Sequence, residues 1–473
     1  MNKDYIVVIG GGLAGSEAAL QIAKHNIKVK LYEMKPVRFS PAHSNQNFAE
    51  IVCSNSFKSN LLTNACGLLK EELRRLDSFL IKTADEVQVP AGQALAVDRD
   101  EFAKKITELI ESNENIEVIK QEVVSKFDDS IDNSDAVFLE DLIKDNIVIV
   151  ATGPLTSSSL SIGIKHLTGN DSLYFFDAAS PIIEKDSINF DIAFYGNRYE
   201  EEKQKEESIE EWKKRLANQE KSYINLPMDK EEYESFVKEL VNAEVVMLHE
   251  FEKTEIFEGC MPIEIMAGRG IDTLRFGPLK PMGFDDPRTG KRPYAIVQLR
   301  QDNKGADLYN MVGFQTNLKF GEQKRVFQMI PGLENANFMK YGVMHRNTFI
   351  NSTKLLDNTY NMREMNNVFF AGQITGVEGY VESISSGMVA SLNAIDLIEN
   401  REKTIFDEET MIGSLANYIS TSNDKFQPMN ANFGILKPFE TKIKDKKLKC
   451  SKLSERALEK IAKKSWHKNN SVL

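Results

Sequence analysis

The chain has 473 residues, more than one hydrophobic core usually holds, so we expect two domains. Its residues are 41% hydrophobic and 27% charged, as in soluble globular proteins, and the net charge of −11 argues mildly against a nucleic-acid partner. The sequence has neither a signal-peptide pattern nor an uninterrupted apolar run of about 18 residues, so we expect a cytoplasmic protein without a membrane span.

The first predicted unit is a strand, a glycine turn, a helix and a second strand. The strand covers residues 5–9, and the turn that follows has the G-x-G-x-x-G spacing of Gly10, Gly12 and Gly15. A second β-run ends directly before Glu33, which lies 18 residues beyond the last glycine. This order of elements, with an acidic residue at that distance, predicts a dinucleotide-binding βαβ unit.

Each residue type in this unit has a physical role. Gly10 permits the tight turn, Gly12 lets backbone N–H groups approach a pyrophosphate, and Gly15 lets helix and strand pack closely. The helix N-terminus offers partial positive charge to the phosphates, and Glu33 would accept hydrogen bonds from ribose hydroxyls. A glycine turn that merely opens an ordinary helix would not explain Glu33. The residues predicted to bind the dinucleotide here are Gly10, Gly11, Gly12, Leu13, Ala14, Gly15 and Glu33.

Two later strands, NIVIVA at 146–151 and VFFA at 368–371, also end at glycines. Ligands of a doubly wound sheet bind beyond the carboxyl ends of its strands, so these glycines suit a cofactor cleft. The long separation between the three strand–glycine junctions is typical of a flavoprotein with an inserted domain. In an NAD dehydrogenase the nucleotide-binding strands usually run together. The further cofactor residues predicted at these strand ends are Gly153, Gly372, Gln373 and Gly376.

The sequence therefore predicts an α/β protein: an FAD-binding, doubly wound, Rossmann-type domain of the glutathione-reductase kind, with an inserted second α/β domain. The expected division is residues 1–154 for the first part of the FAD-binding domain, 155–360 for the inserted substrate domain, and 361–436 for the second part. Residues 437–473 form a basic C-terminal tail.

Two stretches stand out by their charge. Residues 199–221 carry dense opposite charges without glycine or proline, which predicts an exposed helix or helical hairpin. From residue 437 to 468 there are twelve Lys or Arg against four Asp or Glu. Leu453, Leu458 and Ile461 could form the apolar stripe of a packed helix, and a basic tail on an acidic protein is also typical of an RNA-contacting end. Composition leaves these two interpretations open.

The four cysteines, Cys53, Cys66, Cys260 and Cys450, lack C-x-x-C spacing, so we expect free thiols, neither disulfides nor a metal site. Cys53 lies in a polar turn, and Cys260 lies in a turn between Gly259 and Pro262. An inert buried thiol is the commoner case for either cysteine.

Cations follow Cys260 within twenty residues, at Arg269, Arg275 and Lys280. Cations close to a thiol lower its pKa and favour the nucleophilic thiolate. Each of these three side chains could equally be a partner in a surface salt bridge.

With these motifs in view, the chain resembles the folate- and FAD-dependent RNA uracil-5-methyltransferases, whose best-known members act on the T-loop of tRNA. The resemblance covers nearly the whole chain in the order of the family. It rests on GGGLAGSEAA, FSPAHSNQNFAEIVCSNSFKSN, PAGQALAVDRDEF, FEGCMPIEIMAGRG, TLRFGPLKPMG, FAGQITGVEGYVESISSG and FQPMNANFGIL.

The resemblance implies a reaction and its participants. Cys260 in GCMP would be the catalytic cysteine, and Cys53 in CSNS the second functional one. The carbon would come from 5,10-methylenetetrahydrofolate, and the electrons from FAD reduced by NADH or NADPH. Arg269, Arg275 and Lys280 become candidates for binding the anionic folate and RNA.

Three departures from the family concern the choice of RNA. Residues 199–221 look like an insertion, Leu226 replaces the cysteine of the family's Y-x-N-C-P-M, and the tail is basic. The first-ranked target is uridine 54 in the T-loop of tRNA, and a uridine of 23S ribosomal RNA is the alternative.

Other functions remain open. A simple NAD(P)H–flavin oxidoreductase would leave Cys260 incidental, and a flavin-binding RNA-structure factor would not depend on catalysis. A related family that builds aminomethyl groups on tRNA wobble uridines is disfavoured, because its long C-terminal helical domain has no counterpart here.

Overall fold

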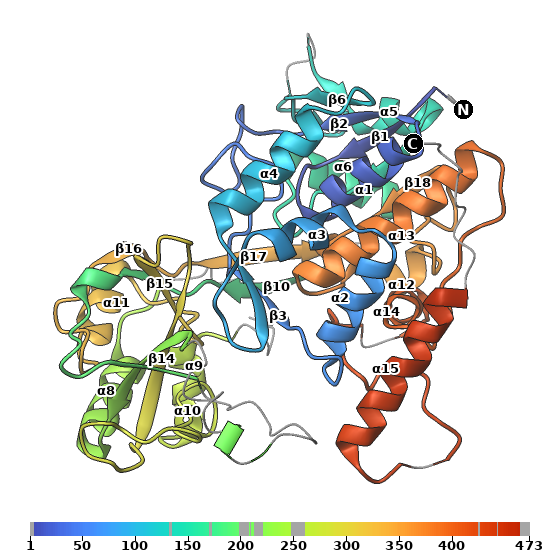
Figure 1. The fold of residues 1–473 in the computed structure, drawn as a ribbon. Helices are drawn as coiled ribbons and strands as arrows, with labels where there is room; N and C mark the ends of the chain where they lie inside the picture. Colours follow the sequence, from blue (N-terminus) through green and yellow to red (C-terminus); the bar gives the residue numbers. More distant parts are fainter. Residues whose placement is uncertain are drawn as a thin grey trace.

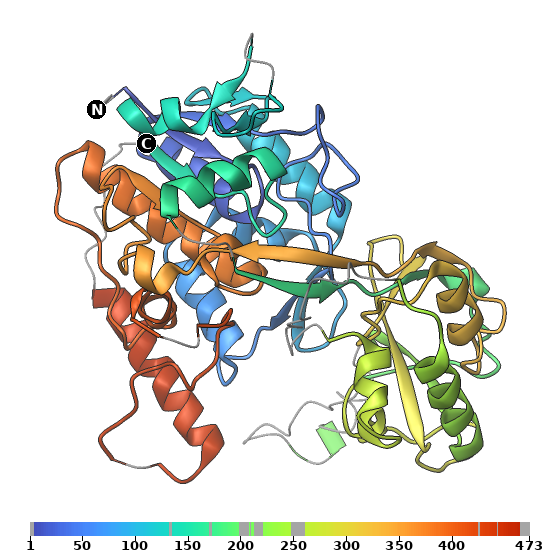
Figure 2. The same cartoon turned by 180° about the vertical axis from the view of Figure 1, so that it is seen from behind.

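The computed structural model of the chain describes residues 4–131, 135–169, 173–197, 208, 210–211, 221–246, 261–423, 426–441 and 443–463. Two lobes are joined by a two-stranded antiparallel ribbon of β10 (Leu173–Ala178) and β17 (Met344–Phe349). Figures 1 and 2 show this ribbon crossing between the lobes from both sides. The chain therefore enters and leaves the second lobe through adjacent strands.

The first lobe contains a five-stranded parallel sheet in the order β18-β9-β1-β2-β6. Its strands are β1 (Tyr5–Ile9), β2 (Lys28–Tyr32), β6 (Ile116–Ile119), β9 (Ile147–Val150) and β18 (Val368–Phe370). Every residue of β9 is buried, which explains its unbroken β-branched run, because a parallel sheet is covered on both faces. The strands predicted around the three glycine junctions are confirmed.

Helices cover both faces of this sheet, with α1 and α13 on one face and α5 and α6 on the other (Figures 1 and 2). The helices of this lobe are α1 (Leu13–Lys24), α2 (Ala65–Arg75), α3 (Phe79–Glu86), α4 (Arg99–Glu111), α5 (Leu139–Asp145), α6 (Ser158–Thr168), α12 (Ser352–Leu355), α13 (Tyr380–Ile398), α14 (Met411–Ser420), α15 (Lys446–Lys463) and the 3₁₀ turn η3 (Gln373–Thr375). Short strands complete it: β3 (Ser56–Ser59), β4 (Gln88–Val89), β5 (Ala94–Val97), β7 (Val123–Val124) and β8 (Val137–Phe138).

The second lobe is built on a six-stranded antiparallel sheet in the order β12-β13-β14-β15-β11-β16. Its strands are β11 (Ile182–Glu184), β12 (Phe194–Gly196), β13 (Tyr223–Met228), β14 (Ala295–Gln301), β15 (Leu308–Met311) and β16 (Phe338–Lys340). Its helices are the 3₁₀ turn η1 (Lys185–Ser187), α8 (Lys230–Asn242), α9 (Ile263–Gly268), α10 (Thr273–Phe276) and α11 (Phe320–Phe327). An α/β second domain is therefore confirmed.

Helix α8 shows why these elements form where they do. Its N-terminus is a capping box, in which the Asp229 carboxylate accepts from the Glu232 N–H and the Glu232 carboxylate accepts from the Asp229 N–H. Tyr233, Phe236 and Leu240, spaced three and four residues apart, are buried in the second hydrophobic cluster. The lobe is thus held by a core of its own.

The two hydrophobic clusters bear on the domain division. The second cluster runs from Ile183 to Ala336, whereas Leu160 and Phe349 pack in the first cluster. We therefore propose that the inserted domain is narrower than residues 155–360, with the ribbon as its stalk. The predicted helix at 199–221 lies outside the described residues, apart from 208, 210–211 and 221. None of the described helices has both the length and the apolar character needed to cross a membrane.

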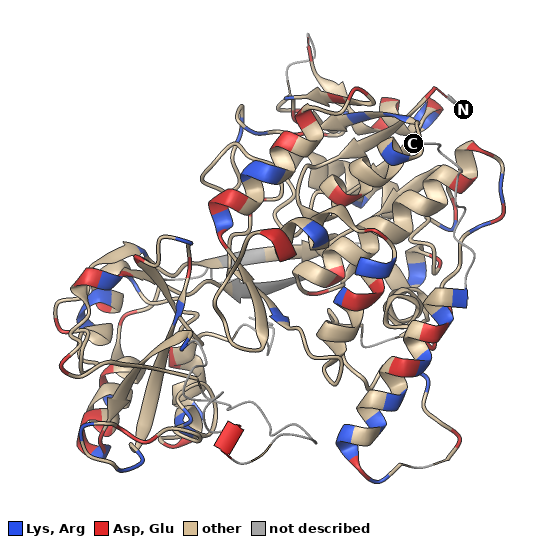
Figure 3. Ribbon diagram, viewed as in Figure 1, with Lys and Arg blue, Asp and Glu red and all other residues tan. Residues whose placement is uncertain are grey.

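The C-terminal helix α15 packs on the first lobe. Leu453, Leu458 and Ile461 are 1%, 7% and 2% exposed and belong to the first hydrophobic cluster, so the predicted apolar stripe is present. Arg456 and Lys460 form ion pairs with Glu409. The exposed side of the helix carries further lysines (Figure 3). The part of the tail that forms α15 is therefore a packed helix with exposed lysines.

A buried carboxyl group joins α2 to α14 and makes stability depend on pH. The Glu72 carboxyl, fully buried, accepts from the N–H groups of Met411 and Ile412 at 2.7 and 2.9 Å, and its burial raises the pKa of Glu72 to about 8. A raised pKa means that the folded state favours the protonated group. Its contribution to stability is thus fully present below pH ~4, near the unfolded pKa, and is lost as pH rises towards 8.

We expect Glu72→Gln to remove this dependence. Thermal melts of both proteins are measured between pH ~4.5 and ~8.5. The melting temperature of the variant should rise relative to that of the wild type as pH rises, because only the wild type has a carboxyl group to ionise there. A melting-temperature difference that stays constant over this range would contradict the assignment.

Candidate functional site: the cofactor cleft

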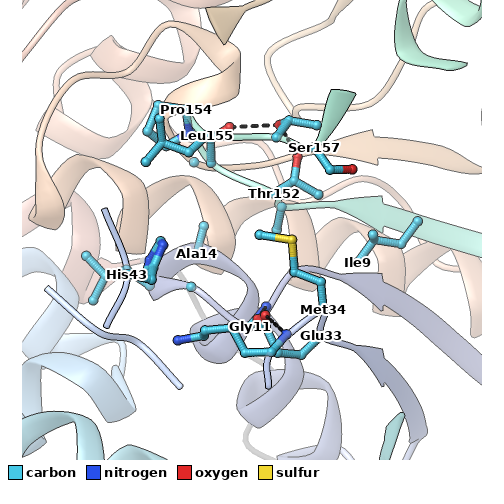
Figure 4. A pocket seen from close by; sticks show the side chains of 18 of the residues that line it. Ile9, Gly11, Ala14, Glu33, Met34, His43, Thr152, Pro154, Leu155 and Ser157 are labelled. Atoms are coloured by element: carbon cyan, nitrogen blue, oxygen red, sulfur yellow. Dashed lines mark hydrogen bonds between the residues drawn. The ribbon is translucent and has the colours of Figure 1, made fainter. Parts of the chain in front are cut away.

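A cleft opens at the carboxyl ends of β1, β9 and β18, where the glycine turns lie. It encloses about 1090 Å³ of empty space, part of it open to solvent. Figure 4 shows Gly11 and Glu33 on one side of this space and Thr152, Pro154 and Ser157 on the other. Cofactor binding beyond the strand ends is what the sheet topology leads one to expect.

Two glycines of the first turn are required by close backbone contacts. Gly10 has φ +99°, and a Cβ there would lie 2.6 Å from the Ala151 carbonyl oxygen. A Cβ on Gly15 would lie 1.8 Å from the Gly10 carbonyl oxygen. Any larger residue would push β1, β9 and α1 apart, so these glycines set the geometry of the turn.

Gly12 has the opposite surroundings. It precedes the first residue of α1, and a Cβ on it would meet nothing within 4 Å. A Cβ on Gly153, across the cleft, would also meet nothing. Gly153 has φ +67°, which favours glycine by itself. At Gly12 the protein imposes no steric need for glycine, whereas a pyrophosphate placed against the N–H groups of α1 would. This space at a helix N-terminus fits the diphosphate of FAD.

Glu33 is fixed at the end of β2. Its carboxylate accepts from the Gly11 N–H at 2.8 Å and from the Lys35 N–H at 2.9 Å, and the residue is 6% exposed. Two carboxylate oxygens have about four acceptor positions, so each oxygen can accept a further hydrogen bond. The arrangement fits an acidic residue that is held rigidly to receive ribose hydroxyls.

The N-terminus of α13 lies at the cleft, as that of α1 does. A Cβ on Gly387 would lie 2.3 Å from the Ala14 carbonyl oxygen, so this glycine lets α13 lie directly against α1. Tyr380 and Ser383, in the first turn of α13, line the cleft. Two helices that are far apart in the sequence thus begin at the same cleft.

Most of the predicted cofactor residues line this cleft, namely Gly10, Gly11, Gly12, Leu13, Ala14, Glu33, Gly153, Gly372 and Gln373. Gly15 is not among the lining residues and acts through backbone packing. Gly376 is also absent from the lining; its φ is +84°, and a Cβ on it would meet the Phe426 ring at 2.4 Å. Gly376 therefore shapes the turn before α13.

Cys53 lies in a loop beside the cleft. The Tyr380 hydroxyl accepts from the N–H groups of Cys53 and Ser54, both at 3.0 Å. Arg99 donates to the carbonyl oxygens of Ile51 and Cys53 at 3.0 and 3.3 Å and pairs with Asp302 at 2.9 Å. These contacts tie the Cys53 loop to α13, α4 and the second lobe.

The same loop is held from the second lobe by Arg300. This buried guanidinium donates to the Ser54 hydroxyl at 2.6 Å and to the Asn55 side-chain oxygen at 2.9 Å. Burial lowers the pKa of Arg300 and raises the pKa of Tyr380, so the Tyr380 hydroxyl stays protonated. The sequence analysis did not predict a role for Arg300 or Tyr380. The segment VEGYVES, which contains Tyr380, was recognisable, but the long-range partner of its hydroxyl was not.

His43 is a further lining residue that the sequence analysis missed. Its Nδ1 lies 2.5 Å from the Ser40 hydroxyl, and burial lowers the pKa of the imidazole. The ring is therefore neutral near pH 7. Next to it, Lys35 and Glu50 also line the cleft and form an ion pair at 3.4 Å.

The remaining predicted site residues lie elsewhere or are not described. Cys260 is outside the described residues. Arg269 is exposed at the end of α9, and Arg275 stacks on the Tyr294 ring at 3.9 Å and pairs with Asp272 at 3.3 Å. Lys280 is partly buried after α10. All three cations belong to the second lobe, and none is among the residues that line the cofactor cleft.

The parallel sheet, the glycine turn and the acidic residue at the end of β2 together define a dinucleotide-binding flavoprotein of the Rossmann type. A family model described as glucose inhibited division protein A matches residues 5–402, so the chain belongs to that family. GidA of Aquifex aeolicus, solved in its form II crystal, covers 97% of this chain and 75% of its own at a TM-score of 0.63 and 16% identity, which supports the fold.

Relatives with higher sequence identity define the family more narrowly. The methylenetetrahydrofolate–tRNA-(uracil-5-)-methyltransferase TrmFO of Halalkalibacterium halodurans is 54% identical over 462 residues, 98% of either chain. That of Acetivibrio thermocellus is 56% identical over 456 residues, covering 96% of this chain and 97% of the relative, and that of Bacillus subtilis is 53% identical over 462 residues. The chain is a member of this family of folate-dependent tRNA (uracil-5-)-methyltransferases.

Proposed function

We propose that this protein transfers a one-carbon unit from 5,10-methylenetetrahydrofolate to C5 of an RNA uridine and reduces it to a methyl group with electrons that NADH or NADPH supplies. The methylene carbon is at the oxidation level of formaldehyde, so two further electrons are needed. FAD, when bound, supplies that two-electron chemistry. The cleft at the carboxyl ends of β1, β9 and β18, with its empty space beside Gly12 and Gly153, carries this proposal.

The protein's own residues would bind and orient the participants. The N-terminus of α1 holds the diphosphate and Glu33 the ribose. Tyr380 and Arg99 hold the Cys53 loop at the side of the cleft, where its thiol would assist removal of the C5 proton. Cys260 is the proposed nucleophile, because C5 of uracil becomes reactive only after a thiolate adds to C6.

The proposed target is uridine 54 in the T-loop of tRNA, since the relatives are named as tRNA methyltransferases. A uridine of 23S ribosomal RNA is the second candidate, and the exposed lysines of α15, a departure from the family, favour it. Leu226, at the family's cysteine position, is fully buried in β13 within the core of the second lobe, so this departure does not contact RNA. An enzyme acting on either RNA would be cytoplasmic.

The competing function is that of a simple NAD(P)H–flavin oxidoreductase. Such an enzyme would oxidise NADPH without methylating RNA, so an assay of methyl transfer distinguishes the two. Purified protein is incubated with NADPH, methylenetetrahydrofolate and one of three RNAs: a tRNA transcript, the same transcript with cytidine at the target position, or 23S ribosomal RNA. We expect 5-methyluridine in the unaltered tRNA and none in its cytidine variant. NADPH oxidation without 5-methyluridine in tRNA or 23S RNA would favour the oxidoreductase.

The basic tail yields a prediction about RNA affinity. Deleting α15 would remove Leu453, Leu458 and Ile461 from the core, so truncation would lower stability as well as charge. Substituting four exposed lysines in α15 and just before it to alanine removes charge without touching the buried stripe; they are Lys444, Lys446, Lys449 and Lys452. The logarithm of the RNA association constant falls linearly with the logarithm of the salt concentration, and each lost phosphate contact makes this slope shallower by about 0.7–0.9. We therefore expect weaker RNA binding with a shallower salt dependence.

This quadruple variant should keep its flavin and melting temperature, since the substituted side chains lie outside the buried stripe. The measurement is a salt titration of RNA binding beside a thermal melt. An RNA affinity and salt slope equal to those of the wild type would end the idea that the tail contacts RNA.

A further inference from the structure

Three aromatic side chains stack at the edge of the second lobe. The Tyr341 ring centroid lies 5.0 Å from that of Phe320 and 5.5 Å from that of Phe338, with ring planes only 15° and 14° apart. Phe338 is anchored in the core by a contact with the Phe327 ring at 6.4 Å. Phe320, at the first position of α11, is 54% exposed. The stack therefore runs from the core of the lobe to solvent.

The segment that carries Tyr341 is rigid and leads back to the cofactor cleft. Gly342 exchanges hydrogen bonds with the Gln323 side chain, at 2.8 Å through its N–H and 2.7 Å through its carbonyl. A Cβ on Gly342 would lie 2.6 Å from the Ala179 carbonyl oxygen, and the neighbouring Ala178 carbonyl accepts from the Cys53 thiol at 3.8 Å. The stack is thus attached to the strand that touches Cys53.

Lys340 lies between the stack and the cleft. It ends β16, next to Tyr341, and its ammonium group interacts electrostatically with Arg99, Glu50 and Cys53. His43, which lines the cleft, also senses the charge of Lys340. The two carboxylates that act on Lys340, Glu50 and Asp302, are already paired with Lys35 and Arg99. A cation whose neighbouring carboxylates have other partners, beside an exposed ring and a reaction cleft, is suited to an anionic ligand.

We propose that Phe320, Tyr341 and Phe338 form a platform on which an unpaired base of the RNA stacks, next to the uridine that reacts, and that Lys340 meets the adjoining phosphate. The inference rests on the proposed function and names the surface by which its RNA is held. A base presents a flat π-face to a parallel aromatic ring, and loops supply bases that are free of pairing. Figure 1 shows α11 and β16 together in the upper part of the second lobe.

The test uses Phe320→Ala and Phe320→Trp in the full-length holoprotein. A matched control is Phe190→Ala, because Phe190 is 41% exposed in the same lobe and stacks on Tyr195 at 5.5 Å. Binding of a T-arm stem–loop RNA and of a fully paired duplex of equal length is measured by fluorescence anisotropy. Flavin content and NADPH-driven flavin reduction are measured on every variant.

Loss of one base stack weakens binding by roughly 5- to 150-fold, so Phe320→Ala should lose about that much affinity for the stem–loop and less than about two-fold for the duplex. Phe320→Trp and Phe190→Ala should stay within about two-fold of the wild type for both RNAs. Flavin content and reduction should not change in any variant.

If Phe320→Ala binds the stem–loop as tightly as the wild type does, the proposal that a base stacks on these rings is wrong. The rings would then be a surface for docking a protein. An equal loss for stem–loop and duplex, or a Trp variant as weak as the Ala variant, would also overturn the proposal. A wild type that methylates RNA while Phe320→Ala binds normally refutes only the platform. A wild type that neither binds nor methylates RNA refutes the proposed function with it.

Discussion

Replacing Gly12 by valine should give a folded protein that has lost most of its affinity for FAD. A Cβ at Gly12 meets nothing within 4 Å, and the residue's φ of −75° is one that valine adopts without strain. The side chain would instead occupy the space where the diphosphate must approach α1. Steric overlap of this kind costs roughly 1–3 kcal/mol, equivalent to an FAD complex about 5- to 150-fold weaker.

The measurement is titration of the apoprotein with FAD, alongside thermal melts of both apoproteins. Gly15→Ala is the matched control, since its Cβ would lie 1.8 Å from the Gly10 carbonyl oxygen and should lower stability whether or not FAD is present. A Gly12→Val protein with wild-type flavin affinity would contradict the assignment of the cleft.

Cys260→Ala should abolish methyl transfer while FAD remains bound. Without a thiolate to add to C6, C5 of the uridine is not nucleophilic, and loss of a covalent catalyst costs roughly 10⁴-fold or more in rate. Incorporation of the methyl group into RNA and flavin absorbance measure the two properties separately. RNA containing 5-fluorouridine should form a covalent adduct with the wild type and none with the variant.

Two other cysteines provide the comparison. Cys53→Ala should slow methylation yet still form the adduct, because Cys53 is proposed to assist the later proton removal. Cys450→Ala, a buried thiol in α15 remote from the cleft, should leave the rate nearly unchanged. An adduct that persists in Cys260→Ala would refute its role, and loss of the adduct in Cys53→Ala instead would assign the nucleophile to Cys53.

The parts of the fold that were predictable are those encoded by local spacing. β1, the glycine turn, α1 and β2 follow one another within 28 residues, from Tyr5 to Tyr32, and the steric demands at Gly10 and Gly15 arise from neighbouring backbone. β9 and β18 were recognisable because strands buried on both faces need uninterrupted apolar runs. The cleft followed, since the carboxyl ends of these strands meet at one edge of the sheet.

The surroundings of Cys53 were not predictable, because they depend on contacts between distant segments. The hydrogen bond between the Cys53 N–H and Tyr380 spans 327 residues, and Arg99 reaches Asp302 across 203. No periodicity or spacing specifies such a pairing, since it depends on how the two lobes meet. Arg275 contacts the Tyr294 ring and the Asp272 carboxylate within the second lobe, and its part in binding folate or RNA stays a prediction.

The most direct test of the proposed function follows the carbon itself. Purified protein with FAD and NADPH is given 5,10-methylenetetrahydrofolate labelled with ¹³C at the methylene carbon, together with unmodified tRNA and 23S ribosomal RNA, and each RNA is digested and analysed by mass spectrometry. The account predicts ¹³C-labelled 5-methyluridine in the tRNA, or in the 23S RNA if the departure in the tail has changed the target. Flavin that is reduced by NADPH, with no labelled 5-methyluridine in either RNA, would contradict it.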